Sequence, residues 1–213
     1  MTTLAPAALD YYTPEAGRLR MEDNLRLLND VLETTPMAGR YWFFGGLLLG
    51  YVREGGIMLH DTKDADFAVH ADDMERLEAS FPALVEAGFV PENRFPGVTG
   101  EATEVSFVRE GAKYEFFRVE VVGDRFRYCN YGTNAAGQTV QNFCEIPAQP
   151  LEDFRFLDRT WLKVRDADLE LTALYGDWRT PRPSFDYMEG PTIVRRAPWD
   201  ASTYNLWGQI YGR

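Results

Sequence analysis

The sequence predicts an α+β fold, and two patterns along the chain point to it. Leu25, Leu28 and Leu32 recur at helical spacing within residues 15–33, which is typical of an amphipathic helix packed on a core. The unbroken aromatic run at residues 41–44 is instead typical of a buried strand. With 45% hydrophobic and 14% aromatic residues, the 213-residue chain has enough apolar material for one sizeable core.

The other expected elements follow from the turn residues and the alternation between them. Helices are expected over 74–87, ended by Gly88, and from Asp166 to residue 175, ended by Gly176. Further strands are expected at 64–69, 103–109, 113–122, 125–129, 154–157 and 160–164. Loops are expected at 89–100 and 130–141.

We divide the chain into three parts. Residues 1–14 contain two prolines and little periodicity, and they are expected to form an arm. Residues 15–185 are expected to form one folded domain. Residues 186–213 are expected to form a C-terminal extension that wraps the surface, with its aromatic side chains held in grooves.

The net charge of −11, from 33 acidic and 22 basic residues, disfavours two classes of partner. Nucleic acids and anionic membrane surfaces both attract basic proteins. Two cysteines, Cys129 and Cys144, do not make a disulfide framework, so we expect free thiols, with a single bridge as the alternative. The first residues lack the basic region and following apolar region of a signal peptide. The apolar run at 41–51 is too short to span a bilayer. We therefore expect a cytoplasmic protein without a membrane span.

Residues 41–69 carry the residues that predict the chemistry. Gly45-Gly46 opens a Leu-rich helix after the aromatic strand. Glycine permits positive φ, and a helix start points free N–H groups at an anion such as phosphate. Asp64 and Asp66 open the next strand at i and i+2, so both carboxylates point to one face. Two adjacent hard oxygen donors suit Mg²⁺, which bridges to substrate phosphates, so this stretch predicts phosphoryl or nucleotidyl transfer.

The same stretch resembles a known family. Gly45-Gly46-Leu47-Leu48-Leu49-Gly50, Arg53, Gly55-Gly56 and Asp64-Ala65-Asp66 resemble the signature of the LicD/fukutin family. The run Tyr-Gly-Asp-Trp-Arg-Thr-Pro at 175–181 resembles that family's closing element, so the resemblance spans residues 20–185. It implies a nucleotidyltransferase fold of the polymerase-β type, in which helices flank a mixed sheet.

The resemblance also implies an activity and a set of residues. Members of this kind transfer a phospho-substituent, such as phosphocholine or ribitol phosphate, from a CDP-activated donor to a sugar hydroxyl with Mg²⁺ or Mn²⁺. By position, the resemblance assigns the phosphate-side turn to Gly45 and Gly46, the metal carboxylates to Asp64 and Asp66, and a place in the substrate pocket to Arg53.

The third metal carboxylate of the family comes from a neighbouring strand, between a hydrophobic and an aromatic residue. Glu115, between Tyr114 and Phe116, is the closest match to that context. Glu104 on the preceding strand is a rival for the same role. Glu120 lies an odd number of residues beyond Glu115, so it is expected on the other face.

Three further residues are candidates for binding the donor. The loop before the two aspartates is one residue longer than in many members and carries His60-Asp61-Thr62-Lys63. His60 is a candidate hydrogen-bond donor to phosphate, and Lys63 a candidate cation beside it. Arg179, in the closing element, is a candidate phosphate-binding cation. A plain structural or solvated role is the alternative for each of them.

Two other functions remain open beside the leading hypothesis of a phospho-alcohol transferase acting on a hydroxylated glycan or small molecule. A true nucleotidyltransferase, which attaches NMP from an NTP to a small molecule or protein, uses the same site geometry. The third function is a non-catalytic nucleotide-binding module of the same fold. Clustered carboxylates argue against a module, because idle metal ligands repel one another.

Overall fold

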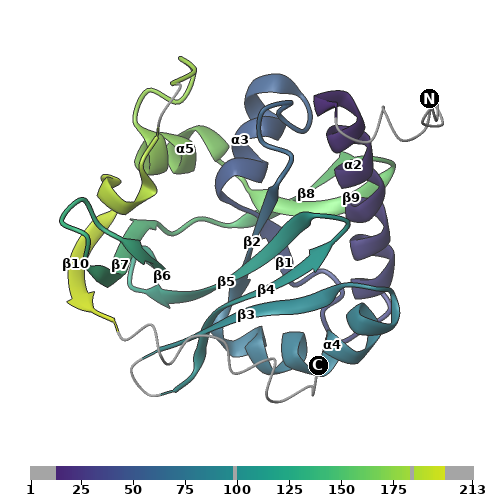
Figure 1. The fold of residues 1–213 in the computed structure, drawn as a ribbon, viewed down its shortest axis with the longest axis horizontal. Helices are drawn as coiled ribbons and strands as arrows, with labels where there is room; N and C mark the ends of the chain where they lie inside the picture. Colours follow the sequence, from purple (N-terminus) through teal and green to yellow (C-terminus); the bar gives the residue numbers. More distant parts are fainter. Residues whose placement is uncertain (1–12, 98–99, 183–184, 200–213) are drawn as a thin grey trace, which may run out of the picture.

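The computed structural model describes residues 13–97, 100–182 and 185–199 (Figure 1). It confirms the predicted α+β class: a mixed sheet of ten strands is flanked by four α-helices in these residues. The helices are α2 (Pro14–Leu32), α3 (Gly45–Glu54), α4 (Met74–Glu86) and α5 (Ala167–Tyr175), with short 3-10 helices η1 (Ala71–Asp73) and η2 (Tyr187–Glu189).

The sheet runs in the order β10-β7-β6-β5-β2-β1-β9-β8, with β4 also paired to β5 and β3 paired to β4. Most pairs are antiparallel, but β2 runs parallel to β5 and β1 parallel to β9. The strands are β1 (Tyr41–Phe43), β2 (Asp64–His70), β3 (Val90–Pro96), β4 (Ala102–Arg109), β5 (Ala112–Val122), β6 (Arg125–Thr133), β7 (Thr139–Pro147), β8 (Leu151–Phe156), β9 (Arg159–Val164) and β10 (Ile193–Pro198).

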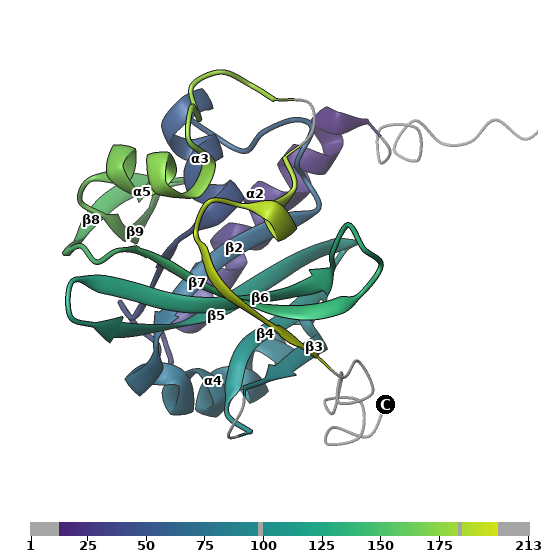
Figure 2. The same ribbon diagram turned by 90° about the vertical axis from the view of Figure 1, so that its left-hand side faces the viewer.

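The helices form two pairs at different places on the sheet. Helix α2 packs against α4, while α3 packs against α5. Figures 1 and 2 show α3 and α5 together at one end of the sheet and α4 at the opposite end. The start of α2 follows from its sequence, because the Thr13 hydroxyl accepts the Ala16 N–H at 3.1 Å and Pro14 is the first helical residue.

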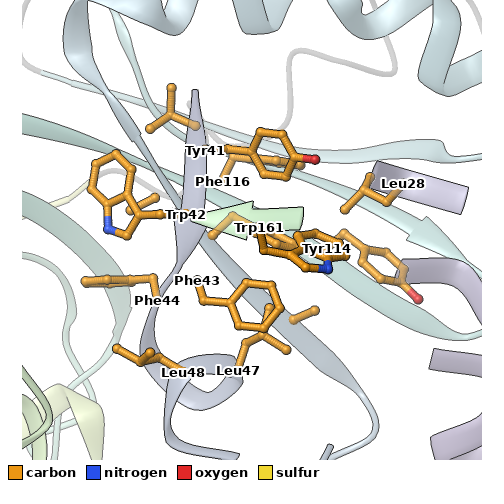
Figure 3. Close-up of a cluster of buried hydrophobic side chains, with 14 of the residues drawn as sticks. Leu28, Tyr41, Trp42, Phe43, Phe44, Leu47, Leu48, Tyr114, Phe116 and Trp161 are labelled. Atoms are coloured by element: carbon orange, nitrogen blue, oxygen red, sulfur yellow. The ribbon is translucent and has the colours of Figure 1, made fainter. Parts of the chain in front are cut away.

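Strand β1 sends aromatic side chains to both faces of the sheet, as Figure 3 shows. Tyr41 and Phe43 lie on one side, where both rings contact Trp161 with centroid distances of 6.1 and 5.0 Å. Trp42 and the following Phe44 lie on the other side. All four side chains are buried, which confirms the buried strand that the unbroken aromatic run predicts.

One predicted loop, at 89–100, is wrong over most of its length, because Val90–Pro96 form strand β3. The pairing of β3 with β4 shifts register between Pro91 and Arg94 and again between Phe95 and Pro96. Such irregularities break the two-residue alternation that marks a strand in sequence, and a proline suits only an edge strand or a bulge.

The second predicted loop, at 130–141, is wrong at both ends. Strand β6 continues to Thr133, and β7 begins at Thr139. Polar residues at the two ends of this predicted loop form hydrogen bonds across β6 and β7. Asn142 donates to the side-chain oxygen of Asn130 at 2.9 Å, and Gln141 donates to the Tyr131 hydroxyl at 2.9 Å.

The predicted C-terminal extension contains a strand that its sequence pattern did not indicate. Ile193–Pro198 form β10, which pairs antiparallel with β7 and becomes the last strand of the sheet. Residues 1–12 of the predicted arm and the aromatic residues beyond 199 lie outside the described residues, while Thr13 and Pro14 begin helix α2. Cys129 and Cys144 are free thiols, as expected. Within the described part of the chain, no helix is both long and apolar enough to cross a membrane.

Glu170 gives the fold a pH dependence that can be measured. It is fully buried in α5, and neither carboxyl oxygen has a hydrogen-bond partner among the described residues. Burial raises the pKa of Glu170 to about 8. In the unfolded chain Glu170 ionises at its ordinary pKa near 4.5. Its contribution to the free energy of unfolding should therefore fall as pH rises from about 4.5 to 8, by ~1.4 kcal/mol per pH unit.

We therefore predict that Glu170→Gln is more stable than the wild type at pH 8, by a few kcal/mol at most. The advantage should shrink toward pH 5, where both side chains are neutral in the folded state. Urea unfolding of both proteins at several pH values measures this difference. A difference that does not change with pH would contradict the burial of an uncharged carboxyl.

Candidate active site

The glycine turn that opens α3 is built around the carboxylate of Asp66. Gly45 has φ of +50°, and a Cβ placed on it would lie 2.5 Å from Asp66 Oδ2. The backbone N–H of Gly46 donates to the same oxygen at 2.8 Å. Gly45 is therefore required by its left-handed conformation and by this contact. A Cβ on Gly46 would be a tighter fit only, 3.1 Å from Asp61 Oδ2 and 3.4 Å from Asp66 Oδ2.

The register of two parallel strands brings the acidic residues together. In the β2–β5 pair, Asp64 lies opposite Lys113 and Asp66 lies opposite Glu115. Residues i and i+2 of a strand share a face, so these four side chains form two adjacent rows on one side of the sheet. Strand β4 continues the arrangement, since it pairs with β5 and contributes Glu104 to the same cavity.

These side chains line a cavity of about 820 Å³, a volume that is ordinary for a small-molecule site. Of the residues predicted from sequence to form the site, seven line it. They are Gly45, Gly46, Arg53, His60, Asp64, Asp66 and Glu115. The rival acid Glu104 and the loop residue Asp61 line it as well.

Burial and mutual repulsion perturb the carboxyl groups of this cavity. Burial raises the pKa of Asp66 well above its ordinary value, and the charge of Glu115 raises it further. Burial, followed by the charge of Glu115, likewise raises the pKa of Glu104. Burial and the charge of Asp64 raise the pKa of Asp61. Acids that repel one another in a cavity are a common feature of functional sites, since a bound cation relieves the repulsion.

Lys113 is the cation that the structure places against this cluster. Its Nζ lies 2.7 Å from Glu115 Oε1. Burial disfavours the ammonium, but the charges of Glu115, Asp64 and Glu104 outweigh it and raise the pKa of Lys113. The sequence analysis missed this residue. The signal available was its position two residues before Glu115, which puts both side chains on one face of β5.

Arg53 links α3 to the segment after α5. Its Nη1 donates to the carbonyl oxygen of Trp178 at 3.3 Å, and its Nη2 contacts Glu54 Oε1 and Met58 Sδ, both at 3.0 Å. Arg53 lines the cavity, so it combines a positive charge at the site with a role in holding the cavity wall.

Two predicted donor-binding residues lie away from the cavity lining. Lys63 is exposed, and its carbonyl oxygen accepts the backbone N–H of Lys113 at 2.6 Å. Arg179 forms an ion pair with Asp168, and its guanidinium carbon lies 4.4 Å from the centre of the Trp178 ring. Neither side chain is among the residues that line the cavity.

Another part of the cavity lining is rich in aromatic residues and was not predicted. It comes from β3, from β6 and from the residues on either side of β10, whose strands the sequence analysis missed in whole or in part. Phe95 stacks on Tyr131 with a centroid distance of 4.6 Å, and Trp199 contacts Tyr131 at 4.9 Å. Other residues of this wall are Tyr128, Asn130, Arg182, Phe185, Tyr187 and Thr192.

The donor set of the cavity fits a hard divalent cation. Asp64, Asp66 and Glu115 offer carboxylate oxygens on adjacent strands, and magnesium prefers such ligands. In residues 13–97, 100–182 and 185–199, no three His, Cys, Asp or Glu side chains already converge as a metal-binding group. One Glu115 oxygen instead contacts Lys113, and one Asp66 oxygen accepts from Gly46. These side chains would have to turn from their present contacts to hold one ion together.

A mixed sheet that carries adjacent carboxylates beside a helix-opening glycine turn defines a nucleotidyltransferase-type domain. The family model described as LicD/FKTN/FKRP, nucleotidyltransferase domain, matches residues 39–161, more than half of the chain, and the protein belongs to this family. No individual curated protein matched the sequence. Members of the family are generally transferases, and membership implies transfer of a phosphosugar or phospho-alcohol group.

The matched residues include the glycine turn, Arg53 and the three predicted metal carboxylates. They end at Trp161, so the predicted closing element at 175–181 lies outside the match. The fold nevertheless brings part of that element to the site, because Tyr175, Trp178 and Thr180 line the cavity.

We predict that Gly45→Ala destabilises the protein more than Gly55→Ala does. Gly45, at the start of α3, and Gly55, its C-cap residue, both have positive φ, which costs an alanine about 1–2 kcal/mol. Only at Gly45 would the new methyl group collide with Asp66, and such overpacking typically costs a further ~1–3 kcal/mol. Gly55 has open space around it and is the matched control. Urea unfolding measures both, and equal losses would show that Asp66 can move aside freely.

Proposed function

We propose that the protein is a Mg²⁺-dependent transferase that moves a phospho-alcohol group from a CDP-activated donor to a hydroxyl group of a glycan or small molecule. The observation that supports this most directly is the β2–β5 register. It aligns Asp64 and Asp66 with Lys113 and Glu115 on the wall of a cavity that also contains the helix-opening turn. Family membership supports the transfer of a phosphorus-containing group.

In this proposal, Asp64, Asp66 and Glu115 hold Mg²⁺ or Mn²⁺. When bound, the ion supplies charge neutralisation to the transferring phosphate and to the leaving group. The N–H of Gly46 keeps Asp66 in place, so one ligand is oriented before substrate arrives.

The remaining residues bind the donor and orient the reaction. In this proposal the start of α3 and the charge of Arg53 bind the donor phosphates, and His60, which also lines the cavity, donates a hydrogen bond to them. The acceptor hydroxyl oxygen forms a bond to the phosphorus that carries the alcohol. The bond from that phosphorus to the bridging oxygen breaks, and CMP leaves with the electron pair. A cavity carboxylate takes the hydroxyl proton.

We predict that Asp64→Asn and Asp66→Asn each lower kcat/KM by a factor of ~100 or more, because each removes a charged metal ligand. Asp153→Asn is the matched control, since Asp153 is an exposed acid on β8, outside the cavity lining. Steady-state turnover with a CDP-alcohol donor measures the effect. Unchanged turnover in Asp64→Asn would remove the metal assignment, and with it this mechanism.

Product analysis tests the reaction itself. We expect Mg²⁺-dependent release of CMP from a CDP-alcohol, such as CDP-choline or CDP-ribitol, when a hydroxylated acceptor is present. Pyrophosphate release from an NTP would instead identify a true nucleotidyltransferase. A protein that binds CDP with Mg²⁺, but releases neither product, would be a binding module. Binding can be detected separately, because a ligand at a hundred times its Kd stabilises the fold by about 2.7 kcal/mol.

A further inference from the structure

The acid cluster contains a cation of its own. The four facing side chains of β2 and β5 are three acids and one lysine, with Lys113 opposite Asp64 and Glu115 opposite Asp66. The Lys113 ammonium contacts Glu115 Oε1 at 2.7 Å. The charges of Asp64, which lies opposite Lys113 on β2, and of Glu104 on β4 also stabilise the ammonium, so acids of three strands act on it.

An ammonium in this position competes with a metal ion for the same oxygens. Two-metal phosphoryl-transfer sites hold their ions about 3.5–4 Å apart, with carboxylates shared between them. Glu115 is the acid best placed to be shared, because it lies beside both Asp66 on β2 and Glu104 in the same cavity. One oxygen of Glu115 is already engaged by Lys113. A second divalent ion at that oxygen would have to displace the lysine or lie against its positive charge.

We propose that the Lys113 side chain takes the place of a second metal ion, so that the cavity would bind one divalent cation, held by Asp64, Asp66 and Glu115. This inference rests on the metal site of the proposed function and specifies how many divalent ions that site binds. Lys113 is then a positioning residue: it orients Glu115 and supplies a fixed positive charge beside Glu115 and opposite Asp64.

The chain offers a matched control for this idea. Lys163 on β9 also forms an ion pair with a glutamate, Glu152, and it does not line the cavity. Lys163→Met therefore removes the same kind of side chain and the same kind of ion pair elsewhere. Lys113→Arg keeps the charge at the site, while Lys113→Met and Lys113→Gln remove it.

Mn²⁺ titration followed by electron paramagnetic resonance counts bound ions without any need for turnover. We expect one Mn²⁺ per chain in the wild type, in Lys113→Arg and in Lys163→Met, and two in Lys113→Met and Lys113→Gln. Circular dichroism shows which variants are folded. If both neutral variants unfold, a count of two Mn²⁺ in the wild type still overturns the inference.

Two Mn²⁺ ions in the wild type would overturn the inference, and so would a single ion in a folded Lys113→Met or Lys113→Gln variant. Either result would leave the proposed transferase intact. No bound Mn²⁺ in the wild type would overturn both, because the carboxylates would then not form a metal site in the free protein.

Discussion

The parallel pairing of β2 with β5 is the constraint on which the rest of the site depends. Tyr114 and Phe116 of β5 are fully buried on one face of the sheet. Glu115, which lies between them in sequence, points to the other face and lines the cavity. A register slip of one residue would turn every side chain of one strand to the opposite face. It would expose the two aromatic rings and bury Glu115 in the core. The hydrophobic core therefore fixes the alignment that brings Glu115 beside Asp66, and fold and site share one source of specificity.

Much of the fold and part of the site could be predicted because they depend on short-range patterns. The glycine pair, the two aspartates of β2 and Glu115 are each marked by their immediate neighbours in sequence. The helices α2, α4 and α5 are marked by apolar spacing and by the residues at their ends. These local signals agree with the global fold, which is what a foldable sequence is expected to show.

The features that could not be predicted from the sequence depend on contacts between segments that are distant along the chain. Lys113 resembles any surface lysine until the register places it opposite Asp64. Asn130 resembles a loop residue, but its side-chain oxygen accepts a hydrogen bond from Asn142 across β6 and β7, so the sheet can bury Asn142. Arg179 was a reasonable candidate by its motif, and its pairing with Asp168 became visible only when α5 was placed beside it.

Strand β10 has a consequence for how much of the chain makes an autonomous folding unit. A fragment cut to the family match at 39–161 would lack α2, α5 and β10. Its core would lose the cover of Leu25 and Leu28, and the free edge of β7 would present unpaired backbone groups, a template for aggregation. It would also lose the Thr192 side of the cavity. The matched residues 39–161 are thus enough to identify the family, but they do not include all the residues that line the cavity.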